Sequence, residues 1–170
     1  MTARQPFEAL VSAHGGTVLR VCRAILSPAD ADDAWSETFL SAMKAYPVLP
    51  ADANVEAWLV TIAHRKAIDV TRAAARRAIP VAETPDPATG TSGSHDLDVG
   101  DDLVGALSRL PAKQKQAVAY HYLAGLPYAD VAAIVGGSAA AARRAAADGI
   151  ANLRRSYPGA TAWKGENDEY

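Results

Sequence analysis

Residues 52–77, DANVEAWLVTIAHRKAIDVTRAAARR, place a cluster of positive charge directly after an apolar helical face. The apolar residues recur at three- and four-residue steps, which predicts a helix packed on a core; they are Val55, Trp58, Leu59, Ile62 and Ala63. Basic side chains held on such a helix can grip a phosphate backbone. The candidates, opposed only by Asp69, are His64, Arg65, Lys66, Arg72, Arg76 and Arg77. A solvated amphipathic helix with ordinary surface charge is the alternative interpretation.

A second candidate site for nucleic acid lies between residues 127 and 155. Pro127 opens a short helix, YADVAAIV, which two glycines end, and Ser138 is a natural N-cap for the helix that follows. Short helix, glycine turn and capped helix form the helix-turn-helix pattern, whose second helix enters the major groove with its N-terminal turns foremost. The residues predicted to face DNA are Ser138, Ala140, Ala141, Arg143 and Arg144. The alternative is an alanine-rich structural helix with an arginine pair on its solvent side.

No constellation of residues suits catalysis or metal binding. The four histidines stand at no metal-ligand spacing and Cys22 is the only cysteine, so neither a zinc site nor an internal disulfide is expected. Asp33 and Glu37 lie four residues apart on one helix face without a partner base, which suits contact with a basic surface better than acid–base catalysis. We therefore predict a protein that is not an enzyme and that uses no metal or cofactor.

Charge is segregated along the chain, although the net charge is only −2. Residues 1–78 carry a net +1 and residues 103–157 a net +5. Between them, residues 79–102 hold six acidic groups and no basic one, and the tail 158–170 is also acidic. Two neutral-to-basic bodies separated by an acidic connector favour a nucleic-acid partner more than the overall charge does.

The segments that carry these residues are all predicted to be helices. Ser27 and Pro28 predict the start of a helix that carries five side chains inward: Trp35, Phe39, Ala42, Met43 and Tyr46. The predicted fold is all-α, with two small helical domains joined by a flexible acidic linker. The boundaries are residues 1–78, linker 79–100, helix-turn-helix domain 101–157 and a tail 158–170 expected to be disordered. No apolar run is long enough for a bilayer, so we expect no membrane contact and a cytoplasmic location.

Three stretches of the chain resemble a known family. They are DADDAWSETFLSAMKAY (30–46), AWLVTIAHRKAIDVTR (57–72) and LSRLPAKQKQAVAYHYLAGLPYADVAAIVGGS (107–138). In this order and spacing they resemble the bacterial RNA polymerase sigma factors of the extracytoplasmic-function group. Residues 6–78 are similar to region 2 of that family and residues 101–156 to region 4.

The resemblance implies a sigma factor that binds core RNA polymerase and directs promoter-specific initiation. The residues at positions matching the polymerase contact are Asp33, Glu37 and Phe39. Those matching the minus-ten contact are Asp52 and Asn54, in a loop that would read a flipped-out base, followed by the basic residues from His64 to Arg77 named above. Region 4 would place Ser138–Arg144 in the minus-thirty-five major groove. The implied partners are core RNA polymerase and promoter DNA, and an anti-sigma factor is common in the group.

The chain departs from the family pattern in its last helix. The family's recognition helix reads Val-Gly-Thr-Val-Lys-Ser-Arg, whereas residues 139–142 are all alanine, and Gly149 costs about 1 kcal/mol within a helix. This predicts a loosely packed region 4 or an unusual minus-thirty-five sequence. Two other hypotheses are a sigma-like adaptor that binds polymerase without promoter selectivity, and a stand-alone helix-turn-helix DNA-binding regulator.

Overall fold

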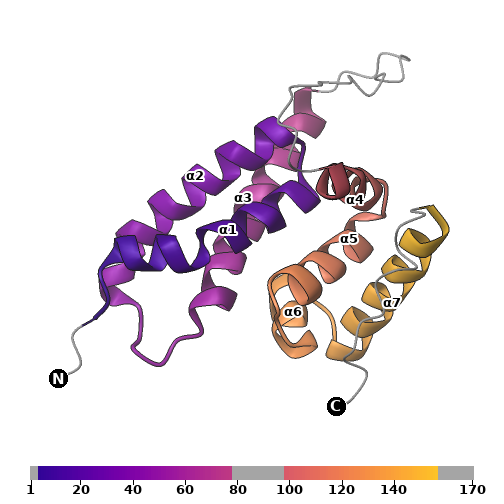
Figure 1. Ribbon diagram of the computed structural model, residues 1–170. Coiled ribbons are helices and arrows are strands. Elements are labelled where there is room, and N and C mark those ends of the chain that lie inside the picture. The colour runs from indigo at the N-terminus through magenta and orange to yellow at the C-terminus, as the bar shows by residue number, and fades with distance from the viewer. Residues whose placement is uncertain (1–3, 78–97, 157–170) are drawn as a thin grey trace.

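The structure, a computed structural model, describes residues 4–77 and 98–156, and all regular elements in these ranges are helices. The first body consists of α1 (Phe7–Ile25), α2 (Pro28–Ala45), a short 3-10 turn η1 (Tyr46–Val48) and α3 (Val55–Arg77). The second consists of α4 (Asp98–Ser108), α5 (Ala112–Val118), a π-helical turn η2 (Ala119–Leu123), α6 (Tyr128–Val135) and α7 (Ala139–Ser156). The predicted all-α class is confirmed (Figure 1).

Helix α4 begins at Asp98, three residues before the predicted second domain at residue 101. The rest of the predicted linker and all of the predicted tail lie outside the described residues. Among the described helices, none combines the length and the apolar character that crossing a membrane requires.

Two helices, α2 and α7, begin at the N-cap serines that the sequence predicts. The Ser27 Oγ accepts a hydrogen bond from the Asp30 backbone N–H at 3.4 Å, with Pro28 in the first turn of α2. The Ser138 Oγ likewise accepts from the Ala141 N–H at 3.1 Å at the start of α7. Each cap supplies an acceptor to a backbone donor that the helix itself leaves unpaired, so these two helices begin where the sequence predicts.

The first body is a three-helix bundle with an aromatic centre. Phe39 of α2 packs against Trp35, with ring centroids 4.8 Å apart, and against Phe7 of α1 at 6.5 Å. The remaining buried residues are aliphatic or small: Leu10, Val18, Cys22, Ala31, Ala34, Ala42, Leu59 and Ala63. Burial also raises the pKa of the Cys22 thiol to about 11, so this thiol stays protonated and unreactive at neutral pH.

In the second body, helix α7 packs mainly through small residues. Ala142, Ala146 and Gly149 recur along one face of α7, and all three are buried. A Cβ added at Gly149 would lie 2.7 Å from Val118 Cγ2 and 3.3 Å from the Gln114 carbonyl oxygen, both on α5. The two helix backbones therefore approach too closely for a larger side chain. At Gly149, therefore, α7 packs closely on α5 and not loosely as expected.

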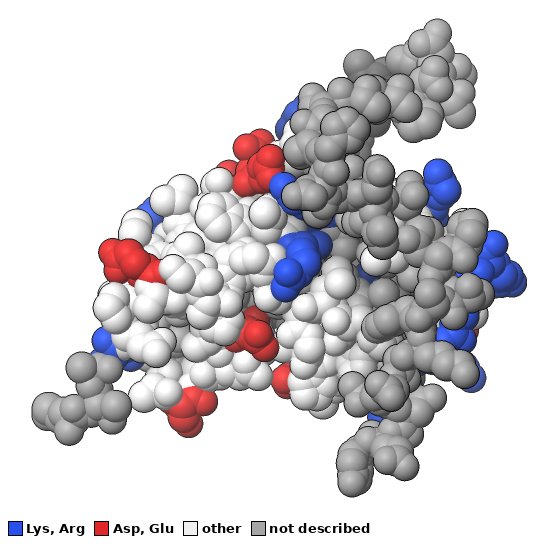
Figure 2. Space-filling view, viewed as in Figure 1, with Lys and Arg blue, Asp and Glu red and all other residues white. Residues whose placement is uncertain are grey.

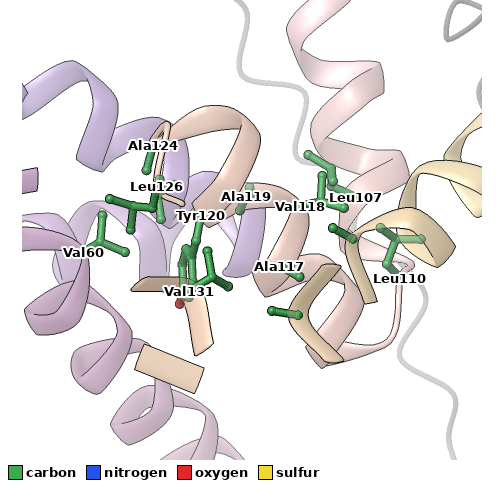
Figure 3. Close-up of a cluster of buried hydrophobic side chains, with 14 of the residues drawn as sticks. Val60, Leu107, Leu110, Ala117, Val118, Ala119, Tyr120, Ala124, Leu126 and Val131 are labelled. Atoms are coloured by element: carbon green, nitrogen blue, oxygen red, sulfur yellow. The ribbon is translucent and has the colours of Figure 1, made fainter. Parts of the chain in front are cut away.

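The two bodies are in contact and share buried apolar residues. Val21 and Ala24 of α1 and Val60 of α3 belong to the same buried cluster as the apolar side chains of the second body. Figure 1 shows the second body beside α1 and α3, and Figure 3 shows Val60 next to Leu126 and Tyr120. The two domains that the sequence predicts as separate are thus joined by one buried apolar cluster, to which both contribute side chains.

Candidate nucleic-acid interface

The basic residues of α3 divide into an exposed set and a buried one. Arg65, Arg72, Arg76 and Arg77 are exposed. Lys66 is partly buried, and its Nζ lies 3.6 Å from the Glu37 carboxylate of α2. Arg65, Arg72 and Arg76 lie within about 40° of one another around the helix, with Arg77 at its end, and we call these four exposed arginines the arginine stripe.

His64 does not belong to this stripe, because it is buried. Its side chain is only 6% exposed, and its Nδ1 lies 2.6 Å from the hydroxyl of Tyr120, a residue of the second body. Burial, and then the positive charge of Arg65, lower the pKa of the imidazole. In this arrangement His64 is neutral and inaccessible, so the phosphate contact expected of it requires the two bodies to move apart.

The loop before α3 places both of the residues predicted to read a base at the surface. Asp52 and Asn54 are exposed. The Asn54 Oδ1 also accepts a hydrogen bond from the Ala57 N–H at 3.2 Å, so this side chain caps α3. The cap fixes the loop against the first turn of the helix that carries the arginine stripe.

The predicted polymerase-binding residues do not all lie on one surface. Asp33 and Glu37 are exposed on α2, whereas Phe39 is 6% exposed in the core of the first body. The apolar side chains beside the acidic residues are instead Leu40, 54% exposed, and Met43, 49% exposed. Met43 was expected to face inward, and this is wrong. Phe39 stands at the edge of the buried face of α2, and Met43, four residues later, has turned past that edge.

The predicted DNA-facing residues at the start of α7 are all at the surface. Ser138, Ala140, Ala141, Arg143 and Arg144 are exposed. A groove of about 660 Å³ runs between the start of α5 and this end of α7, and its polar lining includes Lys113, Gln114, Arg144 and Asp148. Figure 2 shows Lys and Arg side chains gathered on the α7 side of the second body. Small side chains and cations at a helix N-terminus allow the backbone to come close to phosphate.

A stack of side chains that sequence reasoning missed orients Arg143. Its guanidinium carbon lies 5.3 Å from the ring centroid of Tyr128, on α6. The Tyr128 ring is stacked on His121 of η2, with centroids 3.9 Å apart and planes at 13°, and the His121 Nδ1 lies 2.7 Å from the Leu126 carbonyl oxygen. An aromatic face attracts a cation placed over it, so η2, α6 and α7 together position Arg143.

Two adjacent residues of the π-helical turn η2 point to different bodies. Tyr120 is fully buried against the first body, while His121 stacks within the second. Burial is the main cause that raises the pKa of the Tyr120 phenol, so it keeps its proton and can donate to His64. Single π turns widen the helix locally and are frequent at functional positions. The sequence pattern carries no signal for this turn.

Metal ligation has no candidate in the part of the chain that the structure describes: no group of three or more His, Cys, Asp or Glu side chains there is placed to hold an ion.

Comparison with known proteins matches both bodies in the same order. Residues 10–77 match Sigma-70 region 2 and residues 101–153 match Sigma-70, region 4. The ECF RNA polymerase sigma factor SigC of Mycobacterium tuberculosis is 32% identical over 139 residues, which cover 76% of this chain and 71% of the relative. The probable RNA polymerase sigma-C factor of Mycobacterium bovis matches to the same extent.

Two solved structures share the fold. The sigma factor RpoE from Bartonella quintana, solved in complex with the anti-sigma factor NepR, has a TM-score of 0.73 at 22% identity, covering 89% of this chain and 96% of that one. CnrH, solved in complex with the cytosolic domain of CnrY, has a TM-score of 0.60 at 21% identity, covering 88% and 85%. At these identities the likeness concerns the fold alone.

Proposed function

Since the chain belongs to the extracytoplasmic-function sigma factors of the sigma-70 family, which bind core RNA polymerase and direct it to promoters, we propose how its two bodies divide that work. The first body, residues 1–78, holds the polymerase and the melted minus-ten strand. The second, residues 101–157, reads the minus-thirty-five duplex. Sigma factors are non-catalytic initiation factors, and we assign this chain to the same compartment as its template and polymerase, the cytoplasm.

The polymerase contact is assigned to the exposed face of α2. Asp33 and Glu37 supply negative charge, and Leu40 and Met43, three and six residues after Glu37, supply apolar area. Charged groups give orientation and on-rate at an interface, while apolar side chains in its centre give most of the affinity. Phe39 supports this face from beneath, because its ring is packed in the core under α2.

The minus-ten contact is assigned to the arginine stripe of α3 and to the loop before it. Arg65, Arg72, Arg76 and Arg77 would follow the backbone of the melted strand. Asp52 and Asn54 lie at the exposed start of the same helix, where a displaced base would meet them. Lys66 joins the set when its ion pair with Glu37 is exchanged for a phosphate.

The minus-thirty-five contact is assigned to the first turns of α7. Arg143 and Arg144 reach base edges or phosphates, while Ser138, Ala140 and Ala141 let the backbone come close. The stack of Tyr128 and His121 would orient Arg143 for this contact. The observation that carries this function is the presence of both bodies, in order, over a 139-residue match to a sigma factor.

The experiment is run-off transcription from sheared genomic fragments with purified core polymerase. Discrete transcripts that depend on this protein are expected. Binding of core polymerase without any transcript would favour the adaptor hypothesis. Duplex binding that survives deletion of residues 1–78, with no retention of polymerase, would favour a stand-alone helix-turn-helix regulator.

An anti-sigma partner is also proposed. The related fold of RpoE was solved with the anti-sigma factor NepR, and that of CnrH with the cytosolic domain of CnrY. Co-purification with the tagged protein from its native cells, followed by mass spectrometry, would identify such a partner. Recovery of polymerase subunits alone would argue against one.

A further inference from the structure

The chain just before α1 is attached to the loop between α2 and α3, residues 46–54. The guanidinium of Arg4 donates hydrogen bonds to two backbone carbonyl oxygens of this loop, those of Tyr46 and Leu49. Its Cζ also lies 5.2 Å from the centroid of the Tyr46 ring. Tyr46 begins the 3-10 turn η1 and Leu49 follows its last residue, so one side chain holds both ends of the turn that leads out of α2.

Tyr46 makes the same attachment from the side of the loop. Its hydroxyl donates to the Gln5 carbonyl oxygen at 2.7 Å, and its ring packs on Phe7, the first residue of α1, with centroids 5.6 Å apart. Figure 1 shows the start of α1 beside this end of α2. A guanidinium carries several N–H donors in a fixed fork, which suits two carbonyls that a helix end leaves without partners. We call Arg4, Gln5, Tyr46 and Leu49 the N-terminal clasp.

The far end of the same loop is fixed to α3. The Asn54 Oδ1 accepts a hydrogen bond from the Ala57 N–H at 3.2 Å. Between the two attachments the chain makes a turn, in which the Pro50 carbonyl oxygen accepts from the Ala53 N–H at 3.2 Å. Asp52 and Asn54, the residues assigned to the displaced base, therefore lie in a segment that is held on both sides.

From these contacts we propose that the N-terminal clasp positions the loop for minus-ten recognition. Arg4 and Tyr46 hold residues 46–54 in the arrangement in which Asp52 and Asn54 meet the displaced base. Arg4 is thus a positioning residue, because it acts through the loop and not by touching a base. Holding a loop in its bound conformation before binding removes the cost of ordering it at that moment. This inference rests on the proposed minus-ten function of the first body.

The clasp should affect the discrimination between bases more than the overall affinity. A loop that adopts its binding arrangement for only a fraction of the time lowers the affinity for the correct base by that fraction. A fragment with a wrong base at the same position gains nothing from the loop in either case. Release of the clasp should therefore weaken binding of the correct fragment alone, and the ratio between the two affinities should fall.

The test uses holoenzyme assembled from core polymerase and the full chain. The probes are a promoter fragment that yields a run-off transcript and copies of it in which each minus-ten base pair is substituted in turn. One wrong base pair commonly lowers affinity by about 5-fold to about 150-fold. We expect Arg4→Ala to reduce the penalty at the base read by the loop by about threefold to tenfold, the range that one exposed hydrogen bond supplies. The affinity for core polymerase should not change.

The matched control is Arg20→Ala. Arg20 is also exposed and lies in the first body, but its guanidinium donates to Thr17 within α1, at 3.3 Å. Its removal subtracts the same charge and leaves the loop attached. Discrimination and polymerase affinity should both equal those of the wild type.

Two milder variants grade the effect. Arg4→Lys keeps the charge but presents a single ammonium, which does not match two carbonyls as the guanidinium fork does, so it should restore only part of the discrimination. Tyr46→Phe keeps the ring on Phe7 and removes the bond to the Gln5 carbonyl, so its loss should be smaller than that of Arg4→Ala. In the free protein, hydrogen exchange followed by mass spectrometry should be faster over residues 46–54 in Arg4→Ala and unchanged in α3.

Unchanged discrimination in Arg4→Ala, or unchanged exchange over residues 46–54, would overturn the positioning role. An equal loss of affinity for every fragment would also contradict it, because Arg4 would then be a phosphate contact. Loss of polymerase binding together with a lower melting temperature would make the clasp merely structural. A wild-type holoenzyme that tolerates every minus-ten substitution would instead refute the proposed minus-ten function itself.

Discussion

The two bodies differ in the side chains at their helix contacts. In the first, Phe39 contacts both Trp35 and Phe7. In the second, Ala142, Ala146 and Gly149 are buried along α7, and at Gly149 an added Cβ would lie 2.7 Å from Val118 Cγ2 of α5. Large side chains stabilise by the area that they bury, whereas small ones stabilise by letting backbones come close. The two bodies should therefore respond in opposite ways to changes in side-chain size.

The largest effect is expected from Phe39→Ala in the first body. Removing a buried ring leaves a cavity and should lower the free energy of unfolding by about 3–5 kcal/mol. Thermal and urea unfolding followed by circular dichroism would measure it. Leu40→Ala, on the exposed face next to it, should cost far less. A similar loss for both variants would mean that Phe39 is not a core residue.

In the second body the informative change adds a methyl group. Gly149→Ala should lower the free energy of unfolding by about 1–3 kcal/mol, although alanine is the better helix former, because its Cβ would lie 2.7 Å from Val118 Cγ2. Gly16→Ala in α1 is the matched control. No neighbouring atom lies within 4 Å of the added Cβ there, so this variant should gain about 0.5–1 kcal/mol. Stabilisation by both substitutions would contradict the close approach of α5 and α7.

The functional surfaces of the two bodies should also be separable. Arg143→Ala with Arg144→Ala should weaken duplex binding and lower the slope of log affinity against log salt by roughly one unit for each lost phosphate contact. Asp33→Ala with Glu37→Ala should instead weaken polymerase binding. Fluorescence anisotropy with a labelled promoter fragment and with core polymerase would measure both. Loss of both activities in either double variant would argue against this separation.

The smallest effect is a pH dependence of the contact between the bodies. Contact between the bodies lowers the pKa of His64, whereas separation of the bodies would return it toward its usual value near 6.5. As the pH falls below about 6.5, His64 takes up a proton more readily when the bodies are apart than when they are in contact. The contact is therefore most stable above that pH and weakens below it. The groups around His64 do not compensate: Tyr120 keeps its proton, Arg65 is cationic, and Cys22, which acts on Tyr120, is neutral.

Scattering at pH 8 and pH 5.5 would detect this opening as a larger radius of gyration at the lower pH. His64→Gln, whose side chain does not titrate, serves as the control. The same expansion in that variant would assign the pH dependence to other groups.

Much of the architecture could be predicted because its signals are local. Ser27 and Ser138 mark helix starts by accepting hydrogen bonds from backbone N–H groups three positions away, and Pro28 marks one by its fixed φ. Apolar periodicity finds the buried faces. Periodicity reports that a residue faces inward, but not which element it faces. Tyr120 and His64, 56 residues apart, therefore gave no sign that they meet.

The candidate site was predicted less completely, for a related reason. Residue type identified the arginines, and the structure places them at the surface. Phe39 lies in the core although it follows the acidic residues of α2, because a residue two positions after Glu37 points to the opposite side of the helix. The stack of His121, Tyr128 and Arg143 needs three elements to converge, and the π-helical turn that carries His121 has no sequence signature.

The most direct test of the two-body assignment is a footprint of core polymerase, bound with this protein, on a fragment that yields a run-off transcript. We expect two protected or reactive elements about 25 base pairs apart, which is ~85 Å along the duplex. The upstream element alone should be lost in Arg143→Ala with Arg144→Ala. A single protected stretch, or loss of both elements together, would contradict a chain in which one body holds the melted strand while the other reads the duplex upstream.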